Sequence, residues 1–195
     1  MWICPKCQSD CEDNFEECWN CSSRKPGSFV GIEWFVTDSD TILVMPASLL
    51  PAWTGCESTE PGVPGKDWPR AFEYSELIDS LPIGEGYGLI LNEHPAAAFM
   101  EKDGCLHILR WVCADGESDI LKLFSTAASP KMDDKIIEFT HPGGRLCMID
   151  ALDSGSELSY QPLATELPPG KYAIESYTLK APKTELLIHK FRRAV

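Results

Sequence analysis

The chain has 195 residues, of which 44% are apolar, so it is long and apolar enough for one packed domain with a small appended module. Its formal net charge of -13 opposes binding to phosphate backbones and anionic lipid, and no apolar run approaches the roughly 20 residues that span a bilayer. No signal-peptide pattern precedes the first cysteines. We therefore expect a soluble cytoplasmic protein that contacts neither nucleic acid nor membrane.

The N-terminal segment carries two C-x-x-C pairs, Cys4/Cys7 and Cys18/Cys21, separated by ten residues. Each pair supplies two thiolates at a tight turn, and two pairs complete a tetrahedral Zn(Cys)4 site with no open position. A segment this short needs metal binding to fold. We predict that residues 1–27 form a zinc ribbon around one structural Zn2+ held by Cys4, Cys7, Cys18 and Cys21.

Two other interpretations fit this segment less well. Redox chemistry at one C-x-x-C normally requires a βαβ unit, which the segment lacks. The spacing also resembles the Ran-binding-protein type of zinc finger, but Cys11 stands where that family has Asn, and acidic residues replace its RNA-binding arginines. Short bacterial zinc ribbons reading C-P-x-C and C-W-x-C are more similar. Cys11 remains as a surplus thiol.

After a short linker, residues 28–195 read as a second domain. Ile32, Trp34 and Val36 alternate with polar or exposed positions and predict a strand, which the turn 38–40 joins to a central strand at 41–45 in a hairpin. Residues 46–53 form a short helical or irregular stretch, and a short helix begins near Asp67 with Pro69 in its first turn.

Two further hairpins follow, one around the glycine turn 84–86 and one around Lys102-Asp103-Gly104. The clearest helix begins after Gly116, with Ser118 as its cap and Ile120, Leu123, Phe124 and Ala127 on one face. Strands resume at 135–140, 145–150, 171–179 and 185–191. The pattern predicts an α+β fold, a mostly antiparallel sheet with two or three helices, preceded by the small zinc ribbon.

No group of residues in the sequence combines a base, a nucleophile and an oxyanion site. The glycines at 84–88 precede a strand, so they indicate a turn and not a phosphate loop. The four histidines, His94, His107, His141 and His189, form no ligand motif and are interpreted as structural, with His189 on the strand face of Leu187 and Phe191. The sequence predicts a protein that is not an enzyme.

Several strings of the second domain, in order along the chain, are similar to the immunity protein 21 family of bacterial polymorphic-toxin systems. The strings are Trp34, Ile42-Leu43-Val44-Met45-Pro46, Ser48-Leu49-Leu50-Pro51-Ala52-Trp53, Asp67 with Arg70-Ala71, Leu81-Pro82-Ile83-Gly84, Asn92-Glu93-His94-Pro95, Leu109-Arg110-Trp111-Val112, Leu167-Pro168-Pro169-Gly170-Lys171-Tyr172 and Leu186-Leu187-Ile188-His189. The resemblance begins near residue 32. The zinc ribbon and residues 56–66 lie outside it.

The resemblance implies a small cytoplasmic protein that binds and neutralises a toxin made by its own cell. Many such toxins are basic, and an acidic binder is steered to a basic partner. The partner-binding residues expected from this charge are exposed acidic loop positions, namely Asp38, Asp40, Glu57, Glu60, Asp115 and Glu117. Two alternatives stay open, a zinc-ribbon regulatory or nucleic-acid-binding protein and an unrecognised enzyme.

Overall fold

The structure is a computed structural model that describes residues 2–4, 7–12, 19–21, 32–56, 66–71, 73–74, 76–94, 96–127 and 135–194. The chain divides into two compact units, residues 1–31 and 32–195. In the first unit, β1 (Trp2–Ile3) pairs antiparallel with β2 (Asp10–Cys11), with Trp2 opposite Cys11.

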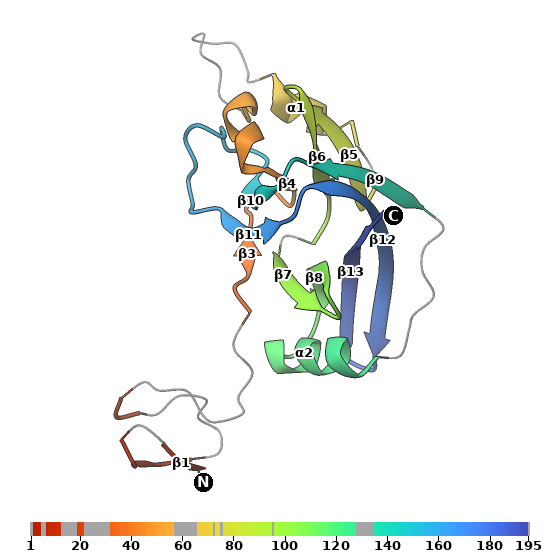
Figure 1. The fold of residues 1–195 in the computed structure, drawn as a ribbon. Helices are drawn as coiled ribbons and strands as arrows, with labels where there is room; N and C mark the ends of the chain where they lie inside the picture. The colour runs from red at the N-terminus through yellow and green to blue at the C-terminus, as the bar shows by residue number, and fades with distance from the viewer. Residues whose placement is uncertain are drawn as a thin grey trace. The chain divides into compact units, whose positions relative to one another are not determined.

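The second unit is built around two antiparallel sheets (Figure 1). The five-stranded sheet has the order β11-β10-β4-β6-β5. Its strands are β4 (Ile42–Pro46), β5 (Ile78–Ile83), β6 (Gly86–Leu91), β10 (Gly144–Asp150) and β11 (Leu163–Leu167). β4 lies at the centre of this sheet and all five of its residues are buried, which confirms the central strand expected at 41–45.

The six-stranded sheet has the order β3-β7-β8-β13-β12-β9. Its strands are β3 (Phe35–Val36), β7 (Ala96–Lys102), β8 (Cys105–Cys113), β9 (Ile136–His141), β12 (Gly170–Ala181) and β13 (Thr184–Arg193). The hairpin β12–β13 is the longest pairing, running from Tyr172 opposite Arg193 to Ala181 opposite Thr184.

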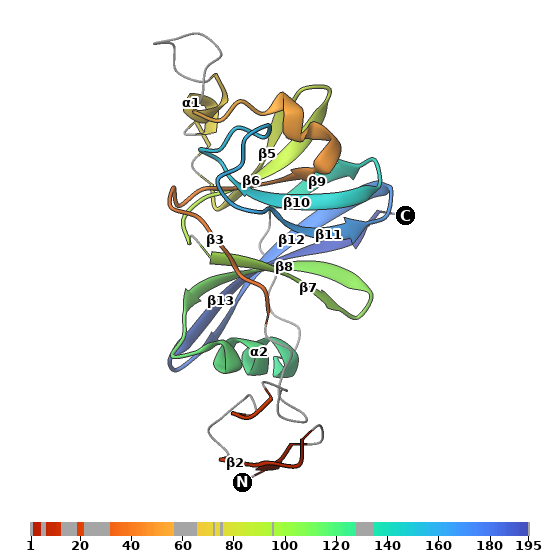
Figure 2. The same ribbon diagram turned by 90° about the vertical axis from the view of Figure 1, so that its left-hand side faces the viewer.

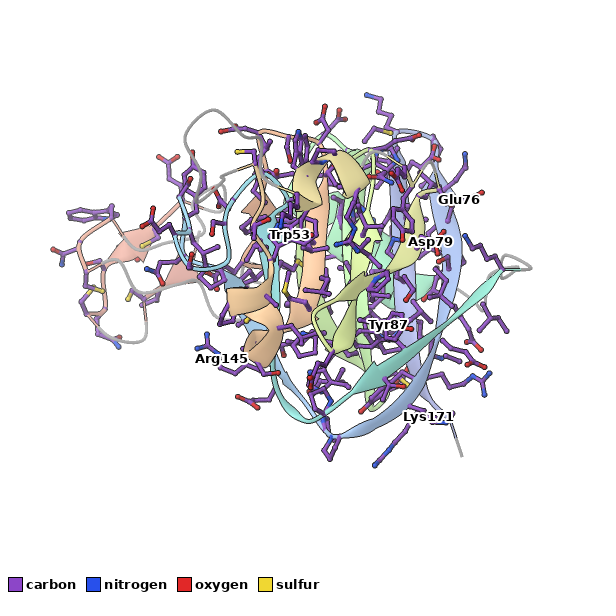
Figure 3. All side chains as sticks on the ribbon, turned by 90° about the horizontal axis from the view of Figure 1, so that it is seen from above. Trp53, Glu76, Asp79, Tyr87, Arg145 and Lys171 are labelled. Carbon is purple, nitrogen blue, oxygen red and sulfur yellow. The ribbon has the colours of Figure 1, made fainter. Side chains whose placement is uncertain are left out.

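The two sheets stack face to face, and short helices cover their outer faces (Figure 2). The main core lies between the sheets, where residues such as Val44 and Leu89 meet Ile108 and Ile174. η1 (Ala47–Ala52) and α1 (Asp67–Ala71) cover the five-stranded sheet over a second cluster that includes the buried Trp53 (Figure 3). α2 (Glu117–Thr126) packs on the six-stranded sheet.

This architecture confirms the predicted α+β class, the hairpins β5–β6 and β7–β8, and the face of α2 that carries Ile120 and Phe124. The glycine-rich segment 84–88 lies in the hairpin β5–β6, as expected. No helix in the described part of the chain is long and apolar enough to cross a membrane.

Three local predictions were wrong. β3 and β4 form no hairpin: β3 pairs with β7 in one sheet, while β4 pairs with β6 and β10 in the other. Within β3 the buried residue is Phe35, whereas Val36 is 59% exposed. Gly116, and not Ser118, is the N-cap of α2, with no side-chain cap hydrogen bond.

Candidate functional site

The space between the sheets becomes polar at one end. Along β8, Leu106 and Ile108 belong to the main core, and the next residue on that face is Arg110. On the same inner face, His189 lies next to Phe191 along β13, and Ser176 lies next to Ile174 along β12. Because side chains alternate strictly along a strand, these three polar groups point inward together. We call Arg110, Ser176 and His189 the inner polar cluster.

Arg110 is fully buried, and its guanidinium holds the turn that follows β6. Nε and Nη2 donate to the carbonyl oxygen of His94 at 3.3 and 2.6 Å, and Nη2 also donates to the carbonyls of Asn92, at 3.2 Å, and Glu93. Burial lowers the pKa of Arg110 to about 9, and the nearby Glu93 carboxylate raises it. The group therefore remains charged at neutral pH.

The turn that Arg110 holds has an unusual backbone. Glu93 and His94 have φ angles of 58° and 42°, in the left-handed region that non-glycine residues rarely adopt. Asn92 ties the same turn to the segment before β5: its amide nitrogen Nδ2 donates to the carbonyls of Tyr74, at 2.8 Å, and Glu76, at 3.0 Å. Through Asn92, Arg110 thereby holds the segment before β5 against the turn that follows β6.

His189 is fully buried beside this clamp. Its Nδ1 is hydrogen-bonded to the hydroxyl of Ser176 at 2.8 Å, whereas its Nε2 has no partner among the described residues. Burial lowers the pKa of His189 well below its usual value, and the charges of Arg110 and His94 lower it further. The imidazole is therefore neutral near pH 7.

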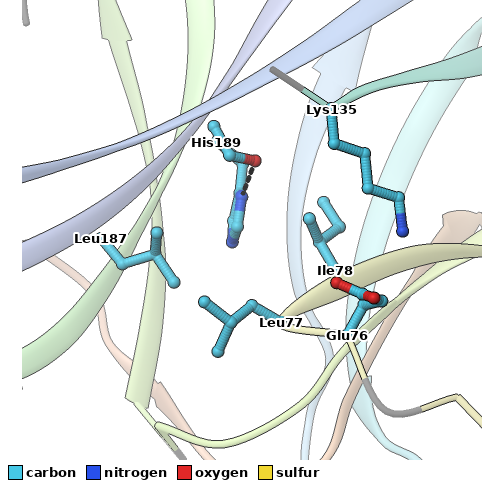
Figure 4. A pocket seen from close by; sticks show the side chains of 7 residues that line it. Glu76, Leu77, Ile78, Lys135, Leu187 and His189 are labelled. Carbon is cyan, nitrogen blue, oxygen red and sulfur yellow. Dashed lines mark hydrogen bonds between the residues drawn. The ribbon is translucent and has the colours of Figure 1, made fainter. Parts of the chain in front are cut away.

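A cavity of about 250 Å3 lies next to His189. Ser176, Leu187 and His189 line it from β12 and β13, and Leu77 and Ile78 line it from the start of β5 (Figure 4). Glu76 and Lys135 complete its lining. Lys135 also forms a 3.2 Å ion pair with Asp79.

The walls of the cavity are mostly apolar, with Glu76 and Lys135 as its charged lining residues, and the imidazole of His189 lies buried behind its surface. The pair Ser176–His189 does not resemble a nucleophile with its base, because Ser176 is only 7% exposed and the imidazole has no carboxylate partner among the residues described.

The predicted partner-binding residues Asp38 and Asp40 are exposed on the loop between β3 and β4. The buried carboxylate of Asp150 organises this loop: it accepts the backbone N–H of Asp38 at 3.1 Å and the Ser39 hydroxyl at 2.5 Å, and also the hydroxyl of Thr37. Asp38 and Asp40 therefore project from a braced loop.

Asp115 lies on a different loop, between β8 and α2, and Glu117, predicted on a loop, is the first residue of α2. Asp115 is exposed and its carboxylate is 3.6 Å from the Lys183 ammonium. Glu117 is half-buried, and its carboxylate accepts the backbone N–H of Ile32 at 2.8 Å. The remaining two predicted residues, Glu57 and Glu60, lie outside the described residues.

The first unit brings three of the four predicted metal ligands together. The sulfur atoms of Cys4, Cys7 and Cys21 all lie within 4.8 Å of one another, and Cys4 Sγ is 3.6 Å from Cys21 Sγ. Four sulfurs at ~2.3 Å from one tetrahedral Zn2+ are roughly 3.8 Å apart. The three described sulfurs fit that donor set, and Cys18 lies outside the described residues.

Local hydrogen bonds shape the turn around these thiols. Gln8, with φ of 61°, donates its N–H to the Cys4 carbonyl at 2.9 Å, and Cys4 donates to the Ser9 carbonyl at 3.0 Å. Trp19 braces the unit by donating its indole N–H to the Asp10 carbonyl at 3.0 Å. The surplus thiol, Cys11, is buried near the three sulfurs, but it is not one of the group that lies within 4.8 Å.

Sequence reasoning did not identify the inner polar cluster. It placed His189 on the correct strand face but treated the four histidines as structural, and it assigned no role to Arg110 or Ser176. His141, also interpreted as structural, is the last residue of β9. Within the resemblance, the strings at 92–95, 109–112 and 186–189 could have signalled this convergence. Arg110 bonds to residues 92–94 and pairs with Leu187, two residues from His189.

Comparison with known proteins gives one positive finding. A family model described as immunity protein 21 matches residues 33–185, which covers most of the second unit. No curated protein and no solved structure matches the chain significantly.

Proposed function

The chain belongs to the immunity protein 21 family, and from this premise we propose that it binds and neutralises a cognate toxin of a bacterial polymorphic-toxin system. The observation that carries the proposal is the family match over residues 33–185, which takes in the strands of both sheets apart from most of β13. In this proposal the protein acts in the cytoplasm and inhibits by binding, without catalysing a reaction.

The charge of the chain supports a basic partner. A net charge of -13 accelerates encounter with a positively charged surface through long-range attraction. Asp38 and Asp40 are suited to such a contact, because both are exposed on a loop that Asp150 already holds in place. A pre-organised loop loses little conformational entropy on binding. We propose Asp38 and Asp40 as contact residues, with Asp115, Glu117, Glu57 and Glu60 as further acidic contributors.

We propose separately that residues 1–27 are a zinc ribbon in which Cys4, Cys7, Cys18 and Cys21 hold one structural Zn2+. The close approach of three of these thiols and the S–S distance of 3.6 Å support this donor set. Four thiolates leave the ion no open coordination position, so its contribution would be to folding. The toxin-binding function is assigned to residues 28–195.

Survival of cells that express the toxin encoded beside this gene tests the proposal. Co-expression of the full chain should restore growth, and residues 28–195 should restore it equally. Failure of the full chain to protect would refute neutralisation. Protection that requires the first unit would instead favour a binding role for the ribbon.

The acidic-contact proposal has a matched control. Reversing Asp38 and Asp40 together to Lys should weaken toxin binding, and the loss should shrink as salt is raised. Reversing Glu85 and Glu101 to Lys makes the same change in net charge at exposed positions on β-hairpins of both sheets. Equal affinities for the two double variants at low salt would show that Asp38 and Asp40 make no specific contact.

A further inference from the structure

The six-stranded sheet ends at β9, and the outer edge of this strand is free. Among the described strands only β12 pairs with β9, so one side of its backbone has no neighbouring strand. β9 contains neither proline nor lysine, two residues that protect many edge strands from further pairing. An edge of this kind can accept an extended segment of another chain through main-chain hydrogen bonds.

A hydrogen bond beside β12 shows which residues of β9 face the free edge. Just after β13, the N–H of Ala194 donates to the carbonyl of Lys171 at 2.8 Å, so Lys171 turns its backbone groups toward β13. Because successive residues of a strand turn these groups to opposite sides, Tyr172 turns its own toward β9, where it lies opposite Phe139. The residues of β9 that alternate with Phe139 therefore point their N–H and C=O groups away from the sheet, and these are Ile136, Glu138 and Thr140.

The five-stranded sheet extends past this edge. β9 lies against β5 and β6, and near the end of their hairpin Pro82 is opposite Tyr87 on one face. Tyr87 shares that face with Leu89, which is buried in the main core between the sheets. Tyr87 is nevertheless 53% exposed, and Pro82 is exposed as well (Figure 3). The inner face of the hairpin therefore overhangs the place that a further strand beside β9 would occupy.

A single added strand would satisfy both features. Its backbone would pair with the outward groups of β9, and the side chains on its inner face would lie beneath Tyr87 and Pro82. Because side chains alternate along a strand, the segment needs apolar residues at every second position. The chemistry that fits is thus an extended segment with one apolar face.

A second copy of this chain does not meet that requirement. A two-fold dimer would pair β9 with the β9 of the other copy. The inward side chains of β9 are already buried in its own core, so they cannot also cover the Tyr87 of a second copy; they are Ile137, Phe139 and His141. Two chains with a net charge of -13 each also repel one another, whereas a basic partner is attracted. The occupant is therefore a different, basic chain.

We propose that an extended segment of the bound toxin adds to the outer edge of β9 as a further strand and packs its apolar face against Tyr87 and Pro82. This assignment rests on the proposed toxin-binding function. The neighbouring edge strand, β5, is a poorer acceptor of such a segment. Pro82 has no N–H to donate, and its carbonyl already accepts a hydrogen bond from Arg70 at 2.7 Å.

Hydrogen exchange of the full chain, followed for each amide by NMR, tests the free edge without a partner. The amides of Ile136, Glu138 and Thr140 should exchange at least tenfold faster than those of Ile137 and Phe139, which bond to β12. Equal protection of the two sets would show that the edge is already occupied and would overturn the proposal.

The same measurement with the toxin encoded beside this gene tests the added strand. In the complex, exchange at the three outward amides of β9 should slow by at least tenfold. Binding that leaves their exchange unchanged would refute strand addition while leaving neutralisation intact. A toxin that does not bind at all would refute the proposed function, and strand addition with it. Slowed exchange that accompanies dimerisation of the free chain would assign the edge to a second copy instead.

Two variants at one position separate the backbone from the side chain. Glu138→Pro removes an outward N–H but no hydrogen bond to β12, so toxin affinity should fall at least tenfold. Glu138→Ala removes the same carboxylate and keeps the N–H, so its affinity should stay within about threefold of the wild type. Equal losses would show that the carboxylate makes the contact and would refute strand addition. If Glu138→Pro does not fold, the exchange of the wild-type amides still decides the result.

The overhanging face has a matched pair of variants as well. Tyr87→Asp places a charge where the apolar face of the added strand would pack, and should weaken toxin binding about tenfold. Tyr160→Asp makes the same change at a tyrosine that is 56% exposed, ahead of β11 at the opposite edge of the five-stranded sheet, and should leave the affinity unchanged. Equal affinities for the two variants would show that the hairpin face is not covered in the complex.

Discussion

Replacing Arg110 with Met tests whether the buried guanidinium stabilises the fold. Methionine keeps a long apolar stem of similar reach but removes all the donors to the turn 92–94. The turn would keep two residues with positive φ angles and lose the group that holds them. The free energy of unfolding is therefore expected to fall.

The magnitude comes from two opposing contributions. Hydrogen bonds from a charged donor to three carbonyl groups contribute roughly 4–9 kcal/mol in total, at ~1.5–3 kcal/mol each. Burial that lowers the pKa of Arg110 to about 9 corresponds to a cost on the order of 5 kcal/mol, at ~1.4 kcal/mol per pKa unit. Subtracting the burial cost from the hydrogen-bond contribution leaves roughly -1 to 4 kcal/mol in favour of the guanidinium, and we take the middle of this range, about 2 kcal/mol, as the expected loss in Arg110→Met.

Urea unfolding of both proteins, followed by circular dichroism, measures this difference. Glu85→Gln is the control, because Glu85 is exposed in the turn between β5 and β6 and is not among the charges that act on Arg110, so its change should stay within about 0.5 kcal/mol. Arg110→Lys keeps the charge but cannot reach three carbonyls at once, and should also be destabilised. An Arg110→Met protein as stable as the wild type, or more stable, would show that burial outweighs the hydrogen bonds and would refute the reasoning.

Three further predictions concern backbone packing, pH and metal. Gly155→Ala should destabilise the fold by about 1–3 kcal/mol, because its Cβ would lie 1.8 Å from the Leu50 carbonyl oxygen. Gly116→Ala, with no atom closer than 4.0 Å, should cost less, since only the preference of an N-cap for glycine over alanine is lost. The free energy of unfolding should fall as pH drops below ~6.5, because His189 takes up a proton in the unfolded chain but not in the folded chain, where its pKa is lowered. In His189→Gln the free energy of unfolding should depend less steeply on pH, and an unchanged dependence would contradict this cause. Chelation should remove one metal ion per chain and narrow the spread of the amide resonances of the first unit, because the unit loses its fold. Cys7→Ser should have the same effect. A metal-free chain with unchanged resonances would exclude a structural ion.

Local sequence patterns were enough to predict the elements whose partners are close in sequence. The hairpins β5–β6 and β7–β8 and the apolar face of α2 follow from turn residues and periodicity. β3 and β4 show the limit of this reasoning. A turn-like Asp38-Ser39-Asp40 suggested a hairpin, yet the loop is held by Asp150, more than 100 residues later in the chain, and its flanking strands belong to different sheets.

The candidate site likewise contains residues that local patterns predict and residues that only long-range pairing brings together. The doubled C-x-x-C spacing is local, so the sequence alone predicts Cys4, Cys7, Cys18 and Cys21 as ligands, and the sulfurs of the three described ones, Cys4, Cys7 and Cys21, lie together. Arg110 and His189 are far apart in sequence, and each stands in an ordinary strand pattern. Only the pairing of β8 with β13 places both at the polar end of the interior, and the β8–β13 register cannot be derived from either string alone.

Titration of the purified toxin with the full chain tests the central claim most directly. A neutralising binder should abolish toxin activity at a fixed molar ratio that does not change with time, and separating the two chains in denaturant should return an intact, active toxin. Inactivation of excess toxin by a substoichiometric amount of the protein, or full toxin activity in the presence of excess protein, would contradict the account.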